Sequence, residues 1–285
     1  MGTLLNRRRY MGGGEAPVKN YLKFTAIEDG TFQYTKALEY SIDNGKTWVS
    51  LAASTATPTI TSGNSILLKG TYTPATSGTN AFSATGNFNA SGNPKSVWAG
   101  DNFETATLPN GAFYRMFKNN TKIVDASELD MSFSTATTEC CFEMFYGCSS
   151  LVSAPQLPAT TVAAQTYAHM FNGCRALTSA TTVLPATTTS RSCYEQMFRN
   201  CSELTTAPVL PALSLAQTCY FYMFNGCSKL NYIKAMFTTI GSNSINQWVQ
   251  GVSSSGTFVK NTNATWTNTG ASGVPTGWTI EYETP

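Results

Sequence analysis

The side chains that most often carry chemistry are scarce in this 285-residue chain, and the first to consider is its single histidine, His169. At the equivalent position of neighbouring, similar segments the chain carries Glu143, Gln196 and Tyr222. A position that accepts such different side chains is expected to face solvent. Because a histidine-based hydrolase would depend on this one residue, the sequence favours a surface role for His169 over catalysis.

Carboxylates are the second route to catalysis, and Asp125, Glu128 and Asp130 lie close together in the sequence. Glycoside hydrolysis needs two carboxyl groups about 5–10 Å apart in a cleft. This cluster falls in a turn between repeated segments with no sign of a cleft, so solvation at the surface is the better interpretation. The chain also lacks a glycine-rich phosphate loop after a strand. We therefore predict that it is not an enzyme and that it uses no cofactor.

The eight cysteines follow a regular spacing rather than a disulfide or metal framework. They are Cys140, Cys141, Cys148, Cys174, Cys193, Cys201, Cys219 and Cys227. Four fall four residues after a recurring Met-Phe pair and three fall four residues before one, which predicts two ladders of buried, reduced thiols. Disulfide bonds or metal binding remain alternatives, but no Cys-x-x-Cys pair favours zinc, and we predict no metal site.

The element that positions these cysteines is a repeat built on Met-Phe. Its methionines are Met116, Met144, Met170, Met197 and Met223, separated by steps of 28, 26, 27 and 26 residues. A period in the twenties indicates a solenoid and lies in the range of leucine-rich repeats.

Each repeat is expected to contain one short helix and one extended segment. In one copy, a tyrosine, a methionine, a phenylalanine and a cysteine occupy positions i, i+3, i+4 and i+7, at Tyr194, Met197, Phe198 and Cys201. This spacing predicts one buried face of a helix. Asn200, like the glycine at the same position of other copies, is expected to adopt a left-handed conformation where the helix ends.

The chain divides into five predicted segments, and the predicted fold class is α+β. Residues 1–19 form a basic, glycine-rich arm, residues 20–74 a small antiparallel β-sandwich module of the immunoglobulin-like kind, and residues 75–112 an N-terminal cap. Residues 113–237 form a leucine-rich-repeat (α/β) solenoid, and residues 238–285 a C-terminal cap containing two strands and a final short helix near residues 246–249.

A hairpin motif lies in the β-module. Residues 41–48 resemble the Asp box of sialidase-type β-propellers, in which the motif stabilises a hairpin and is not catalytic. A propeller needs several copies and this chain has one, so we predict a structural hairpin and infer no glycosidase activity from it.

The repeats of residues 113–237 resemble BspA-type leucine-rich repeats, which are abundant in gut Bacteroides and in their crAss-like phages. The resemblance rests on the Tyr-x-x-Met-Phe-x-Gly-Cys-x-x-Leu core and on the Ala-Pro-x-Leu-Pro-Ala run at residues 154–159. It implies adhesion or binding at a surface and brings no catalytic residues. Residues 6–13 are in addition similar to the heads of Bacteroides phage structural proteins.

Composition and targeting signals narrow the location. Charged residues make up 12% of the chain and the net charge is +2, which argues against nucleic-acid binding. We expect no secretory signal. The sequence contains no run of about 18 apolar residues, so we predict no membrane span. The arm residues Arg7, Arg8, Arg9 and Tyr10 are candidate anchors to a partner, with a disordered terminus as the alternative.

Recognition is assigned to variable surface positions. The candidate binding residues between the core positions are Tyr114, Arg115, Phe142, Tyr146, Phe221 and Tyr222. Exposed aromatic residues are common at interfaces and sugar platforms, although packing between repeats is the alternative. The opposite side of the repeats offers a smaller stripe at Val152, Thr178, Thr205 and Asn231.

These observations lead to one expected function and two alternatives. We expect a non-enzymatic phage virion protein, anchored through its arm to other virion proteins and displaying the repeats to a host protein or glycan. A secreted bacterial surface adhesin is the second possibility, and a carbohydrate-active enzyme is the third. A homo-oligomer is compatible with each of them.

Overall fold

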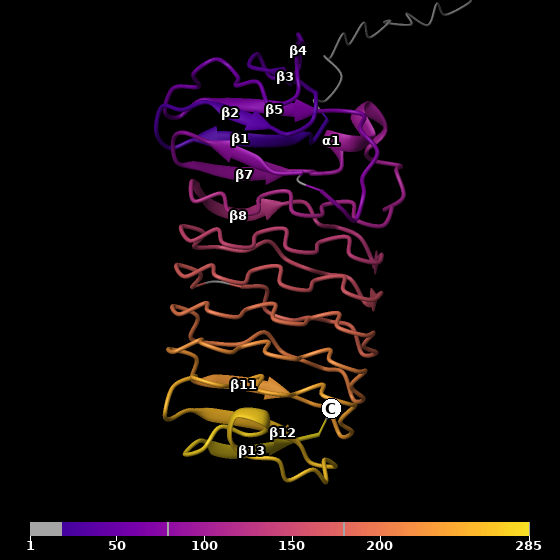
Figure 1. Ribbon diagram of the computed structural model, residues 1–285, viewed down its shortest axis with the longest axis vertical. Helices are drawn as coiled ribbons and strands as arrows, with labels where there is room; N and C mark the ends of the chain where they lie inside the picture. The colour runs from indigo at the N-terminus through magenta and orange to yellow at the C-terminus, as the bar shows by residue number, and fades with distance from the viewer. Residues whose placement is uncertain (1–18, 79, 179, 285) are drawn as a thin grey trace, which may run out of the picture.

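The computed structural model describes residues 19–78, 80–178 and 180–284. They form one elongated stack, with a β-module at one end followed by a β-solenoid of about six turns (Figure 1). The stack runs from β4 at one end of the molecule to β13 at the other. The expected solenoid is therefore confirmed, but the α/β repeats of the predicted α+β fold class are not, because the described residues consist mainly of strands and turns.

The β-module has two layers. Its strands are β1 (Leu22–Ala26), β2 (Phe32–Tyr34), β3 (Leu38–Ser41), β4 (Val49–Leu51), β5 (Ser65–Lys69), β6 (Phe82–Ala84) and β7 (Phe88–Gly92). The main sheet has the order β4-β3-β5-β1-β7-β8, while β2 and β6 form a separate pair. The ring of Phe24 contacts those of Phe32, Phe82 and Phe88 at centroid distances of 5.1, 5.0 and 4.7 Å, which places aromatic packing at the centre of this core.

The predicted boundary at residue 74 is wrong, because the segment expected to be a cap completes the β-module. Strand β7 pairs with β1, and β6 pairs with β2, both antiparallel. Phe82 and Phe88, which fall in the predicted cap, are buried in the module's core. A single helical turn, α1 (Ser96–Ala99), and a 3₁₀ turn at Gly100–Asn102 then lead towards the solenoid.

The β-module and the solenoid share one sheet and one core. Strand β8 (Ile123–Leu129) belongs to the first solenoid turn and pairs in parallel with β7 of the module. The ring of Phe82 stacks on that of Phe117 at 5.7 Å, so the aromatic packing continues from one part into the other. The module therefore covers the first turn of the solenoid directly.

One side of the solenoid, here called the strand side, consists of β8 and the extended segments that follow it turn by turn. At the C-terminal end these become β11 (Tyr232–Ala235), β12 (Thr257–Asn261) and β13 (Thr279–Glu283), paired in parallel. The last two confirm the strands expected in the C-terminal cap. A separate short ladder joins β9 (Thr135–Ala136) to β10 (Thr161–Val162).

The other side, here called the turn side, runs through residues 111–120, 139–148, 165–174, 192–201, 218–227 and 243–251. The structure assigns these segments as consecutive turns, so the expected helices, including the one near residues 246–249, are absent from the described repeats. Every fourth residue is left-handed, as at Ser192, Gln196 and Asn200, with φ of 53°, 52° and 61°. An α-helix cannot contain such residues at regular intervals.

Hydrogen bonding explains why turns replace helices. Alternate amides donate to the next turn of the solenoid, as when Phe171 N donates to Met197 O at 2.9 Å. The amides between them donate three residues back within the same turn, as when Met170 N donates to Tyr167 O at 3.2 Å. Most amides of the turn side thus have a partner without the i to i−4 bonds of a helix.

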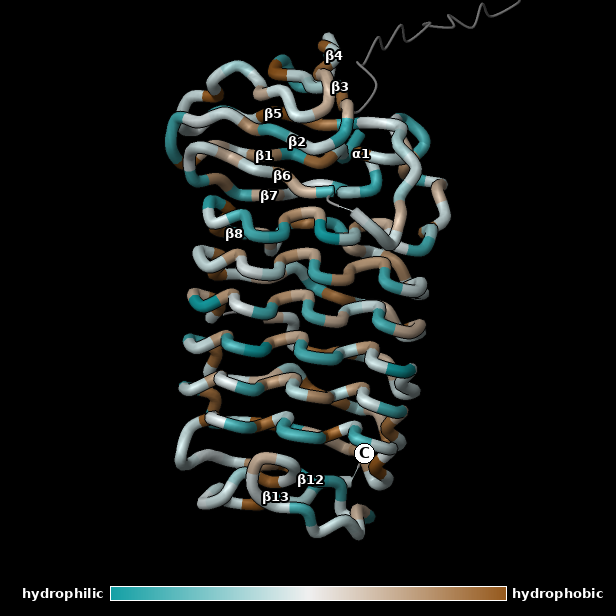
Figure 2. The backbone as a smooth tube through the Cα atoms, in the orientation of Figure 1, coloured by the Kyte–Doolittle hydropathy of each residue, from teal (hydrophilic) through white to brown (hydrophobic). Residues whose placement is uncertain are grey.

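The predicted core face is correct even though the helix is not. Positions i, i+3, i+4 and i+7 share a face at a period of 4 as well as at 3.6, and Tyr194, Met197, Phe198 and Cys201 are all buried. Figure 2 shows the matching alternation of hydrophobic and hydrophilic stretches along each solenoid turn. The phenylalanines of successive turns stack nearly parallel at 5.1, 5.4, 5.5 and 5.7 Å, from Phe117 through Phe145, Phe171 and Phe198 to Phe224.

The cysteines form the expected buried rows of free thiols. In the main row each thiol lies beside a backbone carbonyl of the preceding turn. Cys148, Cys174, Cys201 and Cys227 donate to the carbonyls of Phe117, Phe145, Phe171 and Phe198 at 3.0–3.1 Å. These thiols therefore add hydrogen bonds between turns in addition to filling the core.

Candidate functional site

The candidate site is the outer surface of the turn side, here called the turn face. Along each turn, inward pairs of residues alternate with outward pairs, and each outward pair contains one left-handed residue. The middle of the three outward pairs in successive turns is Tyr114-Arg115, Phe142-Glu143, Ala168-His169, Glu195-Gln196 and Phe221-Tyr222, of which Tyr114 and Ala168 are buried. The inward rows repeat while these pairs change, so the turn face is where each turn differs from its neighbours.

Three rings form an aromatic cluster on the first turns of this face. The Tyr114 ring stacks on that of Phe142 at 5.2 Å with an interplanar angle of 9°, and the edge of His169 meets Phe142 at 5.6 Å. Tyr114, expected to be exposed, is only 7% exposed, because the stacked ring of the next turn covers it. Phe142 is half-buried and remains accessible.

An ion triad lies beside these rings. Glu143 Oε2 accepts hydrogen bonds from Arg115 Nε at 2.5 Å and from Lys118 Nζ at 2.6 Å. Burial raises the pKa of Glu143, but the bonds from Lys118 and Arg115 outweigh it, and the pKa falls below its ordinary value. Lys118 also lies 4.8 Å from the centroid of the Tyr146 ring. The carboxylate therefore holds both cations against the aromatic surface.

His169 lies on the turn face but is not as exposed as expected. It is half-buried against Phe142, and burial lowers its pKa below the ordinary value for histidine. A neutral imidazole beside a phenyl ring serves as packing surface. Among the described residues, no group of three or more His, Cys, Asp or Glu side chains is placed to hold a metal ion.

The structure brings four of the six predicted surface residues together and places the other two on a later turn. Tyr114, Arg115, Phe142 and Tyr146 share the cluster around Glu143. Phe221 and Tyr222 form their own edge-to-face pair at 4.4 Å, and the Arg199 guanidinium lies 5.3 Å from the centroid of Tyr222. The turn face therefore carries two aromatic groups, each with an arginine.

A groove of about 380 Å³ lies next to the first aromatic group. Its lining residues are Tyr146, Gly147, Ser149, Asn172, Gly173, Arg175 and Asn200. It opens because left-handed positions of two consecutive turns are glycines, with φ of 72° at Gly147 and 80° at Gly173. Neither contributes a side chain; the Asn119 amide lies over Gly147, and the space above Gly173 stays open.

Sequence reasoning missed the polar residues of this groove. Arg175 is exposed and has no ion-pair partner among the described residues. Asn172 is buried, and its Nδ2 donates to Gln196 Oε1 at 3.4 Å. Two adjacent repeats with glycine before the cysteine, followed by a repeat with Asn200, are the signal that aligning the copies would have revealed.

The smaller stripe on the strand side is exposed, as expected. Val152 is 38% exposed, and Thr178, Thr205 and Asn231 are also in contact with solvent. Backbone bonds place them in neighbouring turns, from Thr178 N to Val152 O at 3.1 Å and from Asn231 N to Thr205 O at 2.9 Å. The stripe offers methyl and hydroxyl groups but no ring or charge.

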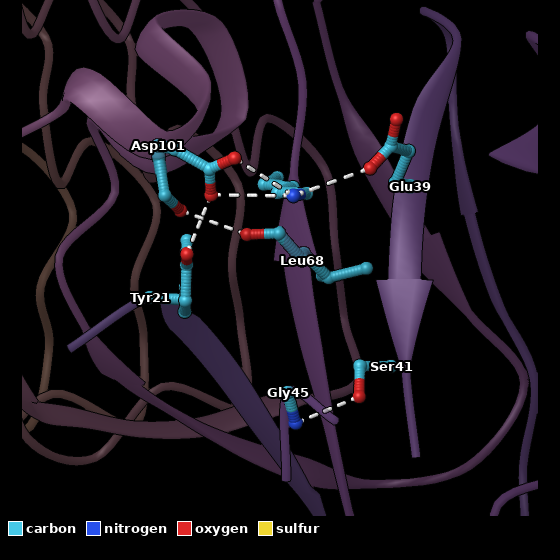
Figure 3. Close-up of polar contacts among 8 residues, drawn as sticks. Tyr21, Glu39, Ser41, Gly45, Leu68 and Asp101 are labelled. Carbon is cyan, nitrogen blue, oxygen red and sulfur yellow. Dashed lines mark hydrogen bonds and ion pairs between the residues drawn. The ribbon is translucent and has the colours of Figure 1, made fainter. Parts of the chain in front are cut away.

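In the β-module, the Asp-box motif has the predicted structural role. Asp43 accepts bonds from Thr47 N at 2.9 Å, Thr47 Oγ1 at 2.6 Å and Ser41 Oγ at 2.7 Å. Ser41 Oγ in turn accepts the amide of Gly45 at 2.8 Å, as drawn in Figure 3. The bonds from Thr47 are the main cause that lowers the pKa of Asp43. Its carboxylate is thereby committed to holding the β3–β4 hairpin.

Figure 3 also shows a polar cluster at Asp101. Asp101 Oδ1 accepts the Tyr21 hydroxyl at 2.5 Å, and Lys69 Nζ lies 3.0 Å from Asp101 Oδ2 and 3.4 Å from Glu39 Oε2. The hydrogen bond from Tyr21 is the main cause that lowers the pKa of Asp101. These groups satisfy one another and join the turn after α1 to the main sheet.

Of the carboxylates considered for catalysis, Asp130 lies apart from Asp125 and Glu128. Asp130 accepts bonds from Asn93 Nδ2 at 3.1 Å and from the Ser132 amide at 3.1 Å. Asp125 accepts the amide and hydroxyl of Ser127, both at 2.7 Å. Asp125 and Glu128 do line an open groove on the main sheet, together with Lys19 and Lys23.

Two further features concern location. The candidate anchors Arg7, Arg8, Arg9 and Tyr10 lie outside the described residues. Among the described helices, none has the length and apolar character needed to cross a membrane.

Comparison with known proteins adds no identity. No protein-family model, no curated protein and no solved structure matches this chain.

Proposed function

We propose that this protein is a non-enzymatic binding scaffold that presents its turn face to a protein or glycan on a host surface. The observation that carries the proposal is the cluster of half-buried rings and held cations around Glu143, set beside an open groove. Interfaces are enriched in aromatic residues and arginine, and rigid presentation lowers the entropic cost of binding.

The proposal separates framework from recognition. The stacked inward rows support the turn face on regular backbone, so the outward side chains are held in place before a ligand arrives. This use of a solenoid agrees with the resemblance to BspA-type leucine-rich repeats, which implies adhesion. It requires no catalytic group, and we propose none.

The test compares binding of the intact chain and its variants to host cells or host mucin. The double variant Phe142→Ala, Tyr146→Ala is expected to lose at least about tenfold in apparent affinity, since aromatic anchors commonly dominate binding. A double variant on the strand side, Val152→Ala, Thr205→Ala, is the matched control and should bind like the original chain. Equal loss in both variants, or in neither, would contradict a binding role for the turn face.

We further propose that the arm places this scaffold on a phage particle. Three consecutive arginines and a tyrosine supply charge and stacking surface, and the following glycines allow the chain to turn onto a partner. Deleting residues 1–14 should abolish incorporation into particles without affecting host-surface binding by the purified protein. If the truncated chain is still incorporated, the arm is not the anchor; recovery of the protein from bacterial surface fractions instead of particles would favour the adhesin.

A further inference from the structure

We infer that the groove over Gly147 and Gly173 is a subsite for a sugar that carries a carboxylate, such as a uronic or sialic acid. The inference rests on the proposed binding function and assigns a ligand class to part of the turn face. The groove volume of about 380 Å³ is within the range of small-ligand sites and suits one or two sugar rings.

The shape of the groove comes from one row of left-handed residues at its floor, the last left-handed position of each successive turn. Asn119 and Asn200 occupy this row on the turns before and after the two glycines. A Cβ atom at Gly147 would meet Asn119 Oδ1 at 2.4 Å, so the Asn119 amide lies over that end of the floor. A Cβ atom at Gly173 would meet nothing closer than Gly147, at 3.6 Å. The gap is therefore open above Gly173 and bounded by amides along the stack.

The charge of the groove favours an anion. No acidic side chain lines it, and Arg175 has no carboxylate partner among the described residues. The nearby cations differ from Arg175 in being engaged: Lys118 binds Glu143, and Arg199 donates to Gln196 Oε1 at 2.8 Å. A guanidinium fork binds a carboxylate through two parallel hydrogen bonds, which distinguishes an acidic sugar from a neutral one.

The remaining lining groups suit the body of a sugar. Tyr146 offers ring surface and a hydroxyl, while Ser149 and Asn200 offer a hydroxyl and an amide at the rim. Few, directed polar groups beside an aromatic surface are typical of sites that orient a polar ligand.

The experiment measures binding of the full chain to defined sugars by calorimetry. The probes are 3′-sialyllactose and a galacturonic acid trimer, with lactose and a galactose trimer as their uncharged counterparts. Arg175→Ala should weaken binding of at least one acidic probe by about tenfold or more, and Arg175→Lys should restore only part of it, because lysine lacks the fork. Arg191→Ala removes another exposed arginine outside the groove and should change nothing.

Each outcome decides a different point. Equal affinity for acidic and uncharged probes would overturn the carboxylate assignment while leaving glycan binding in place. Binding of acidic probes that survives Arg175→Ala would overturn the groove as their site. If no probe binds, the inference fails, whereas the proposed function is judged separately by the host-surface assay with the Phe142, Tyr146 double variant.

Discussion

Both sides of the solenoid join successive turns by hydrogen bonds, but they do so with different backbone conformations. On the strand side, amides bond in both directions along the stack: Thr178 N donates back to Val152 O, while Ala207 N donates forward to Tyr232 O. On the turn side, the backbone amides that bond between turns all donate forward, and left-handed residues recur every fourth position. Parallel strands need only extended backbone, whereas the turn side needs a left-handed residue at every fourth position.

This difference explains where the repeats vary in length. Three left-handed residues four positions apart recur on each turn side, as at 139, 143 and 147 and again at 165, 169 and 173. The extra residue near Val183, where Leu184-Pro185-Ala186 is displaced relative to Leu157-Pro158-Ala159, falls on the strand side instead. The turn side therefore keeps a constant length from repeat to repeat, and the inserted residue lies on the strand side.

The largest expected difference between the sides appears at alkaline pH, because the cysteines belong to the turn side. Burial raises the pKa of Cys227 to about 12, whereas an unfolded thiol ionises near 8.5. In the window between these values the unfolded chain releases a proton that the folded chain keeps. Each such thiol should lower the free energy of unfolding by about 1.4 kcal/mol per pH unit.

Urea unfolding measured from pH 7 to pH 11 checks this slope. Cys201→Ala should make the slope shallower, because burial also raises the pKa of Cys201. Leu204→Ala, a buried change outside the cysteine row, should lower stability without altering the slope. Parallel profiles for all three proteins would show that the thiols do not control alkaline unfolding.

The phenylalanine stack should give the largest effect of a single substitution at neutral pH. Phe171 is fully buried between the rings of Phe145 and Phe198. Phe171→Ala is expected to lower the free energy of unfolding by about 3–5 kcal/mol, through lost burial and a cavity. Val152→Ala on the exposed strand side should cost under about 0.5 kcal/mol. Chemical denaturation measures both, and similar losses would refute the assignment of the core to the ring stack.

The held carboxylate on the turn face should matter more than an exposed ion pair. Glu143→Gln is expected to cost about 1–3 kcal/mol at pH 7, since it weakens bonds to two cations. Because the folded pKa of Glu143 is lowered, this contribution is present above about pH 4.3 and is lost as the pH falls through the folded pKa.

The exposed pair Lys229–Glu203 provides the comparison. Glu203→Gln should change stability by less than about 0.5 kcal/mol. Thermal unfolding from pH 3 to pH 7 distinguishes the two variants, and a pH-independent deficit in Glu143→Gln would argue against a charge effect.

The smallest expected effect is a stability difference between glycine and alanine, and its sign distinguishes a left-handed turn from a helix. Gln165 is left-handed, with φ of 54°, so Gln165→Gly should be more stable than Gln165→Ala by about 1 kcal/mol. In a helix the order would be reversed by a similar amount. At Thr178 on the strand side, alanine should be the more stable choice. Differential scanning calorimetry of these four variants tests the backbone directly.

Much of the framework was predictable from the sequence. The repeat period, the inward rows and the hairpin at Asp43 all follow from local spacing. The helix was wrong because Tyr194, Met197, Phe198 and Cys201 have a spacing that a four-residue turn shares with a helix. The left-handed positions were predicted only in part: the sequence predicts a left-handed Asn200, but not left-handed Gln196 and Ser192.

The surface was less predictable than the core. Tyr114 is covered by a ring of the next turn, a contact that depends on how turns align sideways and not on its own position. The groove likewise needs Gly147 and Gly173 to fall side by side with Arg175 left unpaired. The boundary at residue 74 failed because the β-module draws β7 from beyond it and passes its sheet on to β8.

The forward-pointing amides of the turn side give the molecule two chemically different ends. Their aligned peptide dipoles leave partial negative charge at the module end and partial positive charge at the other. At one end, Phe82 N of the module donates a hydrogen bond to Met116 O. At the other end, Val249 N donates to Ala271 O. By occupying some of these groups, the terminal segments reduce the template on which copies would stack head to tail into an open filament.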